Sequence, residues 1–476
     1  MTNIKLISVK KKIIIIGAGP AGLAAASELN KKKFKSIIFE KSNVVGGLAR
    51  TVKLGNNLFD IGPHRFFTKN NEINKFFIDY AGKDLIKVKR LTRILYQNKL
   101  FNYPLSPVNT FFTLGIYNGI TIFFSYLSSL LFFKKKISSF EDWVIKNFGK
   151  KLYYTFFKTY TEKVWGISCK QIGSDWASQR IKGLNFASII LSFFFKKNKA
   201  KSLIDEFYYL KFGAGNLYEN IKKKLLKKKN KIIFNQKVIK YNFDNKTFNI
   251  KSIIIEDKHL KKKEIFGDFF LSSAPITEVI KSFNIKLPNN IKKIIYSLKY
   301  RNHIGVKLVI KGKIFEDNWI YVHSPEVKVA RISNYKNFSK YMGENKESNP
   351  VTMEYFCNEN DKFWNLSDDT IVSIAKRELE FLKLAKINQI TDSYVIRSEK
   401  AYPVIEKGYQ KKIDEIKKWL SQIKNFIPIG RTGMFKYNNQ DHAILTGLIG
   451  ARKICDDNSL DPWLVNIDAE YHEEKS

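Results

Sequence analysis

The first forty residues place an Ala-rich segment between two short apolar runs. Ile13–Ile16 are four consecutive β-branched residues, and residues 36–39 form a second, mostly apolar run that ends at Glu40. Short apolar runs bounded by turn residues are typical of buried strands, and the Ala-rich segment between them favours a helix. The pattern predicts a βαβ unit over residues 11–41.

Residues 100–133 carry no charge and exceed the roughly 20 apolar residues that a membrane span needs. Polar residues recur in them every three to five positions, which draws a polar stripe along a helix. We therefore predict an amphipathic helix, within a helical region over 104–205, that either packs on a neighbouring domain or lies in a membrane interface. The stripe consists of Ser106, Asn109, Thr113, Asn118, Thr121, Ser125 and Ser128.

Strand patterns return in the second half of the chain. Residues 231–238 and 269–273 read as strands, and alternating apolar runs over 297–395 predict a second, largely antiparallel sheet. Residues 426–455 repeat a strand, turn and helix pattern, and a polar tail is predicted after residue 457. The fold class is therefore α/β, with a Rossmann-like domain, an inserted helical domain and an antiparallel-sheet domain.

Composition excludes a disordered chain and weakens a nucleic-acid function. The 476 residues hold 83 Lys+Arg against 44 Asp+Glu, a net charge of +39, with 44% hydrophobic content. Only 11 of the basic residues are Arg, and the Lys residues occur in short runs along the whole chain. This dispersion favours a solvated surface over a polyanion groove, so no nucleic-acid partner is predicted.

Three scattered cysteines predict buried thiols in a reducing compartment, since they are too few for a disulfide framework or a metal cage. No secretory signal is readable at the N-terminus. We predict a cytoplasmic protein, with peripheral contact of residues 104–136 to the inner face of the membrane left open.

A Gly-x-Gly-x-x-Gly motif lies directly after the first predicted strand and directly before the predicted helix. Such glycines permit a tight turn, close approach of a pyrophosphate, and close packing of helix on strand. Glu40 follows Gly22 by 18 residues, where a carboxylate can accept hydrogen bonds from a ribose. A glycine turn without a ligand is the alternative. The predicted cofactor residues here are Gly17, Ala18, Gly19, Pro20, Ala21, Gly22, Glu40 and Lys41.

A second glycine turn, followed by an arginine, comes soon after Glu40. It offers more backbone N–H groups and a cation for phosphate, which suits an extended dinucleotide. Together the two motifs resemble the fingerprint of the FAD-dependent amine-oxidase and protoporphyrinogen-oxidase superfamily, and that resemblance implies FAD. The residues added are Gly46, Gly47, Leu48, Ala49 and Arg50.

Further segments across nearly the whole chain resemble the UDP-galactopyranose mutases of that superfamily. Residues 60–68 resemble the mutase loop that lies against the flavin ring, which implies that role for Gly62, Pro63 and His64. Arg65 and Phe67 depart from the mutase pattern, and a purely structural turn is the alternative.

Four segments resemble mutase positions that meet the substrate. The family implies stacking by an aromatic ring, a two-arginine clamp on the substrate pyrophosphate, and tyrosines that assist it. Packing in the protein core is the alternative for the aromatic residues. The residues are Trp165, Arg180, Arg301, Tyr335 and Tyr402.

Residues 429–445 resemble the closing motif of the family. There a Gly-Arg turn meets the FAD pyrophosphate, and a helix N-terminus meets the flavin, where it would stabilise negative charge. Helix capping alone is the alternative for Asn439 and Asp441. His442 departs from the mutase pattern, and its role is open. This set comprises Gly430, Arg431, Asn439, Asp441 and His442, with Val238 from the strand at 231–238.

The mutase resemblance implies that reduced flavin acts on a nucleotide sugar and interconverts its pyranose and furanose forms, with NAD(P)H as a possible electron donor. The rival is an FAD-dependent oxidoreductase acting on an amine, a porphyrinogen or a lipid-like substrate, and the apolar helix and altered His64 loop favour it. A basic surface binder that retains FAD is a third class. No catalytic triad or metal cluster is predicted.

The resemblance also implies a domain order. Three parts of an FAD-binding domain alternate with a helical lid and a substrate domain. The predicted segments are 1–103 (FAD), 104–206 (helical), 207–284 (FAD), 285–425 (antiparallel sheet), 426–456 (FAD) and 457–476 (tail).

Overall fold

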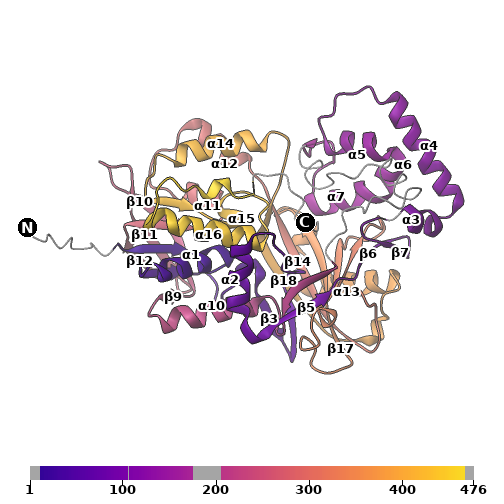
Figure 1. Cartoon of the computed structure of the whole chain (residues 1–476), viewed down its shortest axis with the longest axis horizontal. Coiled ribbons are helices and arrows are strands. Elements are labelled where there is room, and N and C mark those ends of the chain that lie inside the picture. The colour runs from indigo at the N-terminus through magenta and orange to yellow at the C-terminus, as the bar shows by residue number, and fades with distance from the viewer. Residues whose placement is uncertain (1–10, 106, 175–204, 467–476) are drawn as a thin grey trace, which may run out of the picture. The chain divides into compact units, whose positions relative to one another are not determined.

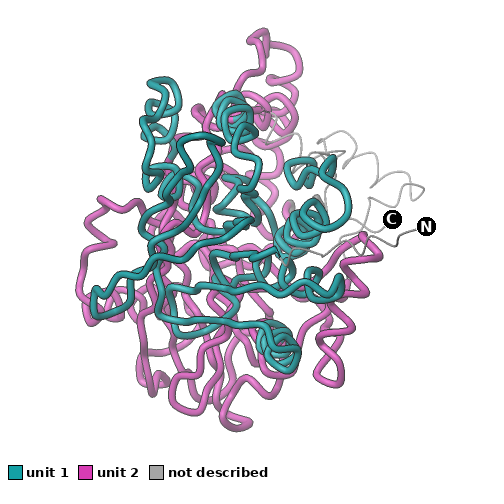
Figure 2. Tube along the Cα trace, turned by 90° about the vertical axis from the view of Figure 1, so that its left-hand side faces the viewer, with its two compact units in different colours: residues 1–47, 217–298, 410–467 teal, residues 48–216, 299–409, 468–476 magenta. Residues whose placement is uncertain are grey.

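The computed structural model describes residues 11–105, 107–174 and 205–466. The chain divides into two compact units, coloured separately in Figure 2. The boundaries of the two units differ from those of the predicted segments, because residues 48–103 group with the antiparallel sheet. The functional assignment of the predicted domains stays a prediction. Unit 1 comprises residues 1–47, 217–298 and 410–467, and unit 2 comprises 48–216, 299–409 and 468–476.

Unit 1 is built on a five-stranded parallel sheet. Its central strand β1 is buried along its whole length, as a strand covered on both faces must be. The predicted βαβ unit and the C-terminal strand, turn and helix are confirmed. In sheet order the strands are β19 (Phe426–Pro428), β13 (Phe269–Ser272), β1 (Ile13–Ile16), β2 (Ser36–Phe39) and β9 (Lys231–Ile233).

Helices α1 (Pro20–Lys31) and α16 (Gln440–Cys455) lie side by side in unit 1 (Figure 1). A Cβ at Gly447 would lie 2.1 Å from the Ala21 carbonyl oxygen, so the two helices approach closely only because that position has no side chain. The N-termini of both helices belong to predicted cofactor motifs.

The rest of unit 1 corrects two predictions. Residues 231–238 form parts of two strands, because Asn235 in the turn between them has φ of +55°. The segment after residue 457 is not simply a polar tail: Trp463 is buried, and the Lys436 ammonium donates to the Trp463 carbonyl at 2.6 Å. Its other elements are β10 (Gln236–Phe243), β11 (Ile250–Asp257), β12 (Lys262–Phe266), α10 (Gly215–Lys227), α11 (Ile276–Lys281), α12 (Asn289–Ser297), α14 (Tyr409–Leu420) and α15 (Gly430–Gly433).

Unit 2 is built on a seven-stranded sheet, confirming the predicted antiparallel domain. All neighbouring strands are antiparallel except β6 and β15, which run parallel. In sheet order the strands are β18 (Ile390–Pro403), β14 (Tyr300–Lys311), β17 (Ser348–Cys357), β16 (Arg331–Asn334), β15 (Trp319–Val322), β6 (Thr92–Tyr96) and β7 (Lys99–Asn102).

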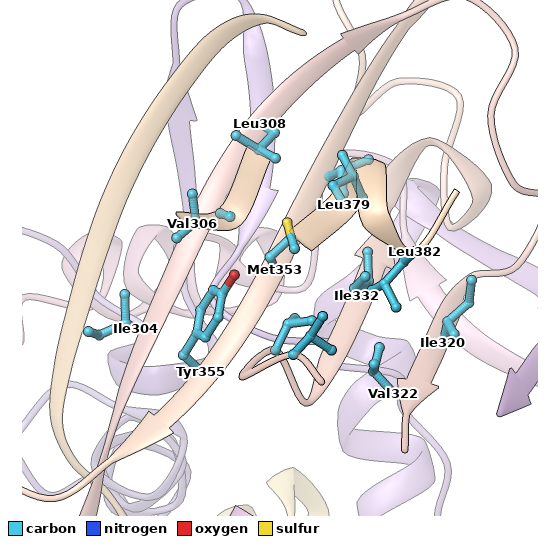
Figure 3. Close-up of a cluster of buried hydrophobic side chains, with 14 of the residues drawn as sticks. Ile304, Val306, Leu308, Ile320, Val322, Ile332, Met353, Tyr355, Leu379 and Leu382 are labelled. Carbon is cyan, nitrogen blue, oxygen red and sulfur yellow. The ribbon is translucent and has the colours of Figure 1, made fainter. Parts of the chain in front are cut away.

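One face of this sheet carries the main apolar core of the unit. Strand β14 contributes Ile304, Val306 and Leu308 at alternate positions, and Met353 comes from β17. Helix α13 (Asp368–Phe381) covers them, and Figure 3 shows Leu379 among these side chains. The opposite face of β14 therefore carries the residues in between, including His303 and Lys307. Unit 2 also contains two two-stranded sheets: β3 (Thr51–Leu54) with β4 (Asn57–Asp60), and β5 (Leu85–Lys89) with β8 (Glu206–Leu210).

The predicted helix over 100–133 is wrong as a single element. Residues 99–102 form β7, and Gly115 at φ of +89° separates two helices, a conformation that a continuous helix excludes. No helix within the described ranges is long and apolar enough to cross a membrane. Unit 2 also contains α2 (Asn71–Ala81). Its helices between residues 107 and 165, gathered in purple in Figure 1, are α3 (Pro107–Leu114), α4 (Ile116–Phe132), α5 (Phe140–Phe148), α6 (Lys150–Leu152) and α7 (Lys158–Trp165), with a π-helical turn at Tyr153–Phe157.

Two of the three cysteines, Cys169 and Cys357, are buried thiols as predicted, whereas Cys455 is half-buried. The predicted helical region continues to residue 205, but its part from 175 to 204 lies outside the described residues.

Candidate functional site

The first glycine turn of unit 1 joins β1 to the N-terminus of α1. Gly17 adopts φ of +98°, and its N–H donates to the Phe39 carbonyl at 2.8 Å. A Cβ at Gly22 would lie 2.0 Å from the Gly17 carbonyl oxygen, whereas a Cβ at Gly19 would meet only the Cα of Gly47, at 3.9 Å. The backbone is therefore closely packed between Gly17 and Gly22 and open at Gly19. A pyrophosphate that approaches a helix N-terminus requires this open position.

Glu40 is held at the end of β2 with both carboxylate oxygens engaged. Oε2 accepts the Ala18 N–H at 2.6 Å, and Oε1 accepts the N–H and hydroxyl of Ser42, both at 2.9 Å. The bond to Ala18 ties the carboxylate to the glycine turn. A carboxylate has about four lone-pair sites, so this one can accept further hydrogen bonds from ribose hydroxyls.

The second glycine turn packs directly on the first. The Gly46 N–H donates to the Ala18 carbonyl at 2.9 Å, and a Cβ at Gly47 would lie 3.3 Å from the Cα of Gly19. Lys41 is exposed between the two turns. Val238 lies in β10, whose first residue, Gln236, donates its N–H to the Glu40 backbone carbonyl at 2.9 Å.

The Gly430 turn and the start of α16 reach the same region of unit 1. A Cβ at Gly430 would lie 3.1 Å from the Ala21 Cβ, which places the turn beside the first turn of α1. The Gly430 N–H donates to the Thr446 hydroxyl at 2.9 Å. Arg431 donates through Nε to the Asn438 carbonyl at 2.8 Å and lies over the ring of Tyr437. These contacts hold the guanidinium at the mouth of the turn.

The structure gives His442 a role that the sequence left open. Its Nδ1 accepts the Asn439 N–H at 3.2 Å, so it caps the N-terminus of α16 from position N3. An accepting Nδ1 places the proton of a neutral imidazole on Nε2. Asp441 is buried in the same first turn, where the helix dipole favours a carboxylate.

These turns bring together the predicted cofactor residues of unit 1. Backbone N–H groups, two helix N-termini and a fixed carboxylate surround positions at which Cβ atoms are missing. This donor set fits a dinucleotide, because phosphates accept from the N–H groups and a ribose donates to the carboxylate. We call the residues of the three turns, Glu40 and the first turn of α16 the dinucleotide cradle.

In unit 2, the loop that carries Gly62, Pro63 and His64 begins at Asp60, which is fully buried. Burial raises the pKa of Asp60 to about 6, although hydrogen bonds from Thr51, Tyr209 and Ala214 oppose the rise. The Thr51 hydroxyl donates at 2.5 Å and the Tyr209 hydroxyl at 2.6 Å. The start of the loop is thus fixed by side chains from other elements.

Lys307 lies under the same loop with its ammonium buried. Its Nζ donates to the Asp60 carbonyl at 2.7 Å and to the Thr352 hydroxyl at 3.1 Å. Tyr335, buried as well, donates to the Asp60 carbonyl at 2.9 Å. Burial lowers the pKa of Lys307 to about 7, against the opposing effect of Glu354 and Asp60.

Glu354 and Arg331 form a buried pair beneath Gly62. Two guanidinium nitrogens of Arg331 donate to the two carboxylate oxygens at 2.7 and 2.6 Å, and His303 Nε2 lies 3.1 Å from Oε2. Burial raises the pKa of Glu354, but the charge and hydrogen bonds of Arg331 outweigh it and lower the pKa to about 2. A Cβ at Gly62 would lie 3.2 Å from the carboxylate.

We call Asp60, Lys307, Glu354, Arg331 and His303 the buried ionic cluster. Its contacts with the loop reach Asp60, Ile61 and Gly62. Farther along the loop, His64 Nε2 lies 2.7 Å from the Leu48 carbonyl oxygen. Leu48, Ala49 and Arg50 lie just before β3 in the same unit. The predicted role of this loop at a flavin ring stays a prediction.

Arg301 is buried, and most of its guanidinium N–H groups donate hydrogen bonds to other residues of the protein. It donates to the carbonyls of Lys163 and Val164 at the C-terminus of α7, to the Phe356 carbonyl, and to the Asn358 side chain. Four of its five N–H donors are thereby bonded within the described part of unit 2. The remaining donor, on Nη1, lies on the side of Asp361, 3.7 Å away.

The structure brings two further predicted substrate residues to Arg301. Tyr402 is its partner in the register of β14 and β18, and Trp165 is buried at the end of α7, which Arg301 caps. Tyr335 lies instead with the buried ionic cluster, and Arg180 lies outside the described residues. An open polar cleft beside Arg301 is lined by Lys158, Glu162, Gly166, Ile167, Ser168, Asn358 and Asp361.

Comparison with known proteins supports both the cradle and the fold. Residues 15–80 match the model of the NAD(P)-binding Rossmann-like domain. The chain is 31% identical over 169 residues to dTDP-fucopyranose mutase of Escherichia coli, covering 34% of this chain and 43% of the relative. It is 44% identical over 88 residues to 1-hydroxycarotenoid 3,4-desaturase of Flavobacterium sp. (strain P99-3), 18% of each chain.

Solved structures extend the fold similarity to almost the whole chain. A reduced UDP-galactopyranose mutase superposes with a TM-score of 0.81 at 20% identity, over 93% of this chain and 95% of that one. A putative protoporphyrinogen oxidase from Exiguobacterium sp. 255-15 gives 0.69 at 14% identity, over 94% and 98%.

The predicted resemblance is confirmed. This chain has the fold common to these mutases and oxidases, and its relatives in sequence include mutases and desaturases. The sequence matches given above span less than half the length of these relatives, so the activity of this chain is a matter for proposal.

Sequence reasoning missed the buried ionic cluster. His303 and Lys307 lie four positions apart in a strand pattern, hence on one face, but only the pairing of β14, β17 and β16 places them beside Glu354 and Arg331. A lysine inside an otherwise apolar strand, Val306-Lys307-Leu308, was the available signal.

Proposed function

We propose that this chain is an FAD-dependent enzyme that interconverts the pyranose and furanose forms of a nucleotide sugar. The observation that carries the proposal is the 169-residue sequence match to a dTDP-fucopyranose mutase, accompanied by a similar match, at 26% identity, to a probable UDP-galactopyranose mutase of Klebsiella pneumoniae. The dinucleotide cradle supplies the groups that such an enzyme needs for its cofactor.

FAD, when bound, supplies a ring system that in its reduced form can act as a nucleophile or as a hydride donor. The cradle residues divide the binding work. Glu40 accepts from the ribose, and the N-terminus of α1 with Arg431 receives the phosphates. The N-terminus of α16, held by His442, stabilises negative charge on the ring system.

The substrate side of the proposal rests on the Arg301 region. The remaining N–H on Nη1 can donate one hydrogen bond to a diphosphate in the adjoining cleft, where Lys158 adds a second cation. Trp165 and Tyr402 supply apolar and hydroxyl surface around it, and Arg180 is proposed as a second phosphate ligand. These groups bind and orient the nucleotide so that the sugar lies in reacting geometry.

A specific observation favours a second candidate, an FAD-dependent oxidoreductase. Because protein carbonyls already occupy most of the Arg301 donors, the pyrophosphate clamp is weaker than the mutase resemblance implies. Relatives named as desaturases and as an L-amino-acid oxidase match over shorter segments. This candidate predicts oxidation of a substrate that carries no nucleotide.

The deciding experiment uses the holoprotein reduced with dithionite under nitrogen. UDP-galactofuranose and dTDP-fucopyranose are supplied separately, and the ring form of the product is followed by chromatography. Conversion of either substrate without net consumption of reductant is expected. Absence of conversion, together with oxygen uptake on adding an amine, a porphyrinogen or a polyene, would overturn the mutase in favour of the oxidoreductase.

A matched pair of variants reports on the substrate side. Arg301→Lys should raise the KM for the nucleotide sugar, because a single ammonium replaces the guanidinium. Arg377→Lys, at an exposed arginine of α13, is the control and should leave KM unchanged.

A further inference from the structure

Helix α4 turns its apolar side chains toward solvent. Tyr117, Phe124 and Leu131 are 79%, 63% and 71% exposed, and they recur every seven residues, so they share one face of the helix. Ile120 and Phe123 are exposed on the same side. The apolar surface extends along a helix of 17 residues, about 25 Å at 1.5 Å per residue.

The opposite face of α4 packs on the protein through the buried residues Gly119, Ile122, Tyr126 and Ser129. The Ser125 hydroxyl accepts the Lys151 N–H at 2.9 Å, and Ser129 is buried. A Cβ at Gly149 would lie 2.8 Å from the Tyr126 backbone nitrogen, so the turn before α6 approaches the helix backbone closely. A water-facing helix has the reverse arrangement, with its polar stripe outward. On α4 the predicted stripe residues Asn118, Thr121 and Ser125 are instead half-buried, and Ser128 is exposed.

The exposed charges that follow α4 in the sequence, and those at the start of α6, are lysines. Between Asp84 and Glu141 the chain has eight basic residues and no acidic one, but the more distant Arg93 is already paired with Asp317. Lys134, Lys135 and Lys136 are exposed directly after α4, and Lys150 and Lys151 are exposed on the neighbouring helix. Only Lys135 of the first three is ion-paired in the described structure, with Asp142 at 2.9 Å.

We propose that α4 docks this protein on an anionic lipid bilayer, with its apolar face in the acyl boundary and the flanking lysines at the lipid phosphates. The helix lies in the interface, because it is too short and too polar on one side to cross. A second copy of the same face is the weaker occupant, because it would bring the exposed lysines beside α4 together with a second set of the same lysines, and residues 85–140 offer no carboxylate to pair with them. The proposal is independent of the proposed function.

Co-sedimentation of the holoprotein with vesicles tests the proposal. The vesicles contain phosphatidylcholine alone or phosphatidylcholine with phosphatidylglycerol. Binding to the anionic vesicles is expected, and raised salt should weaken it. Ile120→Ser with Phe124→Ser and Leu131→Ser should lower the partition coefficient about 100-fold, because three side chains no longer enter the bilayer.

The chain offers one matched control for the apolar contribution to lipid binding and one for the contribution of the lysines. Leu260→Ser with Phe266→Ser and Tyr296→Ser removes three exposed apolar residues elsewhere and should leave binding unchanged. Lys134→Gln with Lys135→Gln and Lys136→Gln should weaken binding to anionic vesicles about 100-fold, since each lysine near the surface contributes about 1 kcal/mol. The same change at Lys261, Lys262 and Lys263 should have little effect.

Three results would overturn the proposal. One is binding to anionic vesicles that equals binding to phosphatidylcholine alone. Another is lipid binding that survives the α4 triple variant while cofactor content and folding are unchanged. The third is concentration-dependent dimerisation, lost in that triple variant, without any vesicle binding; it would assign the face to a second copy.

Discussion

The dinucleotide cradle of unit 1 and the buried ionic cluster of unit 2 are two ways of building a site. The cradle is made largely of backbone groups, to which Glu40 is tied by hydrogen bonds, and its shape depends on missing side chains at Gly17, Gly19 and Gly22. The cluster is made of charged side chains that several strands place under the loop at Gly62. The cradle is therefore specified by short stretches of sequence, and the cluster by strand pairing.

The two constructions also differ in what a substitution should change. A side chain added to a glycine of the cradle blocks a ligand. It disturbs the fold only where another part of the backbone already lies against that glycine. A side chain removed from the cluster leaves a buried charge without its partner, which costs folding free energy. The predictions below separate ligand binding from stability in the two regions.

The largest effect is expected from Glu354→Leu in the cluster. The change leaves Arg331 and His303 without their buried acceptor, which should lower the free energy of unfolding by about 3 to 5 kcal/mol. Denaturant titration of the apoprotein measures the loss. Glu347→Leu, at an exposed glutamate of the same unit, is the control and should change stability by less than about 0.5 kcal/mol. Equal, small effects of both variants would show that the cluster contributes little to stability.

Two glycines of the cradle should respond differently to the same substitution. Gly22→Ala places a Cβ against the Gly17 carbonyl and should cost about 1 to 3 kcal/mol of stability, as well as FAD binding. Gly19→Ala meets no close neighbour, so stability should hold while FAD affinity falls. Denaturation of the two apoproteins and FAD titration measure both properties. An unchanged FAD affinity in Gly19→Ala would remove that position from the cofactor site.

Lys307→Met tests the cluster through pH. The folded pKa of Lys307, about 7, lies below its ordinary value of 10.5, so its contribution to stability is greatest above pH 10.5 and declines as the pH falls toward 7. The methionine variant lacks this decline. As the pH falls from 10 to 7, the free energy of unfolding of the variant should therefore rise relative to that of the native chain, by up to about 1 kcal/mol per pH unit. Denaturation at several pH values measures the slope, and Lys311→Met, at an exposed lysine of the same strand, should keep the native slope.

The smallest effect is expected from His442→Leu in the cradle. Loss of the Nδ1 acceptor leaves the Asn439 N–H uncapped, at a cost of about 1 kcal/mol. Thermal denaturation measures it. A variant as stable as the native chain, but with weakened FAD binding, would instead point to direct contact between His442 and the cofactor.

The sequence allowed the cradle to be predicted because its signals are local. The turn from Gly17 to Gly22 needs only its own residues and the adjacent strand, and Glu40 follows the next strand. Arg301 was predicted as a phosphate ligand from a local resemblance, but two of its four bonded donors hold the end of α7, more than 130 residues earlier in the chain. Such a partner becomes visible only when the fold is known.

The helix over 100–133 shows a second limit. The predicted polar stripe is divided between α3 and α4, and periodicity gives the faces of a helix but not the direction in which each face points. Contacts of Ser125 and Tyr126 with the residues around Gly149 place that side of α4 against the protein and leave the apolar side exposed. Trp463 likewise lies in a segment that composition alone marks as a tail, and its burial depends on distant groups such as Lys436.

The cofactor content of the purified chain tests the central claim most directly, since the cradle is proposed to hold FAD. The visible absorption spectrum and chromatography of the released cofactor are the measurement. The account predicts a yellow protein with flavin bands and about one FAD per chain, whether as purified or after incubation with FAD. A folded, colourless protein that takes up no FAD would contradict it.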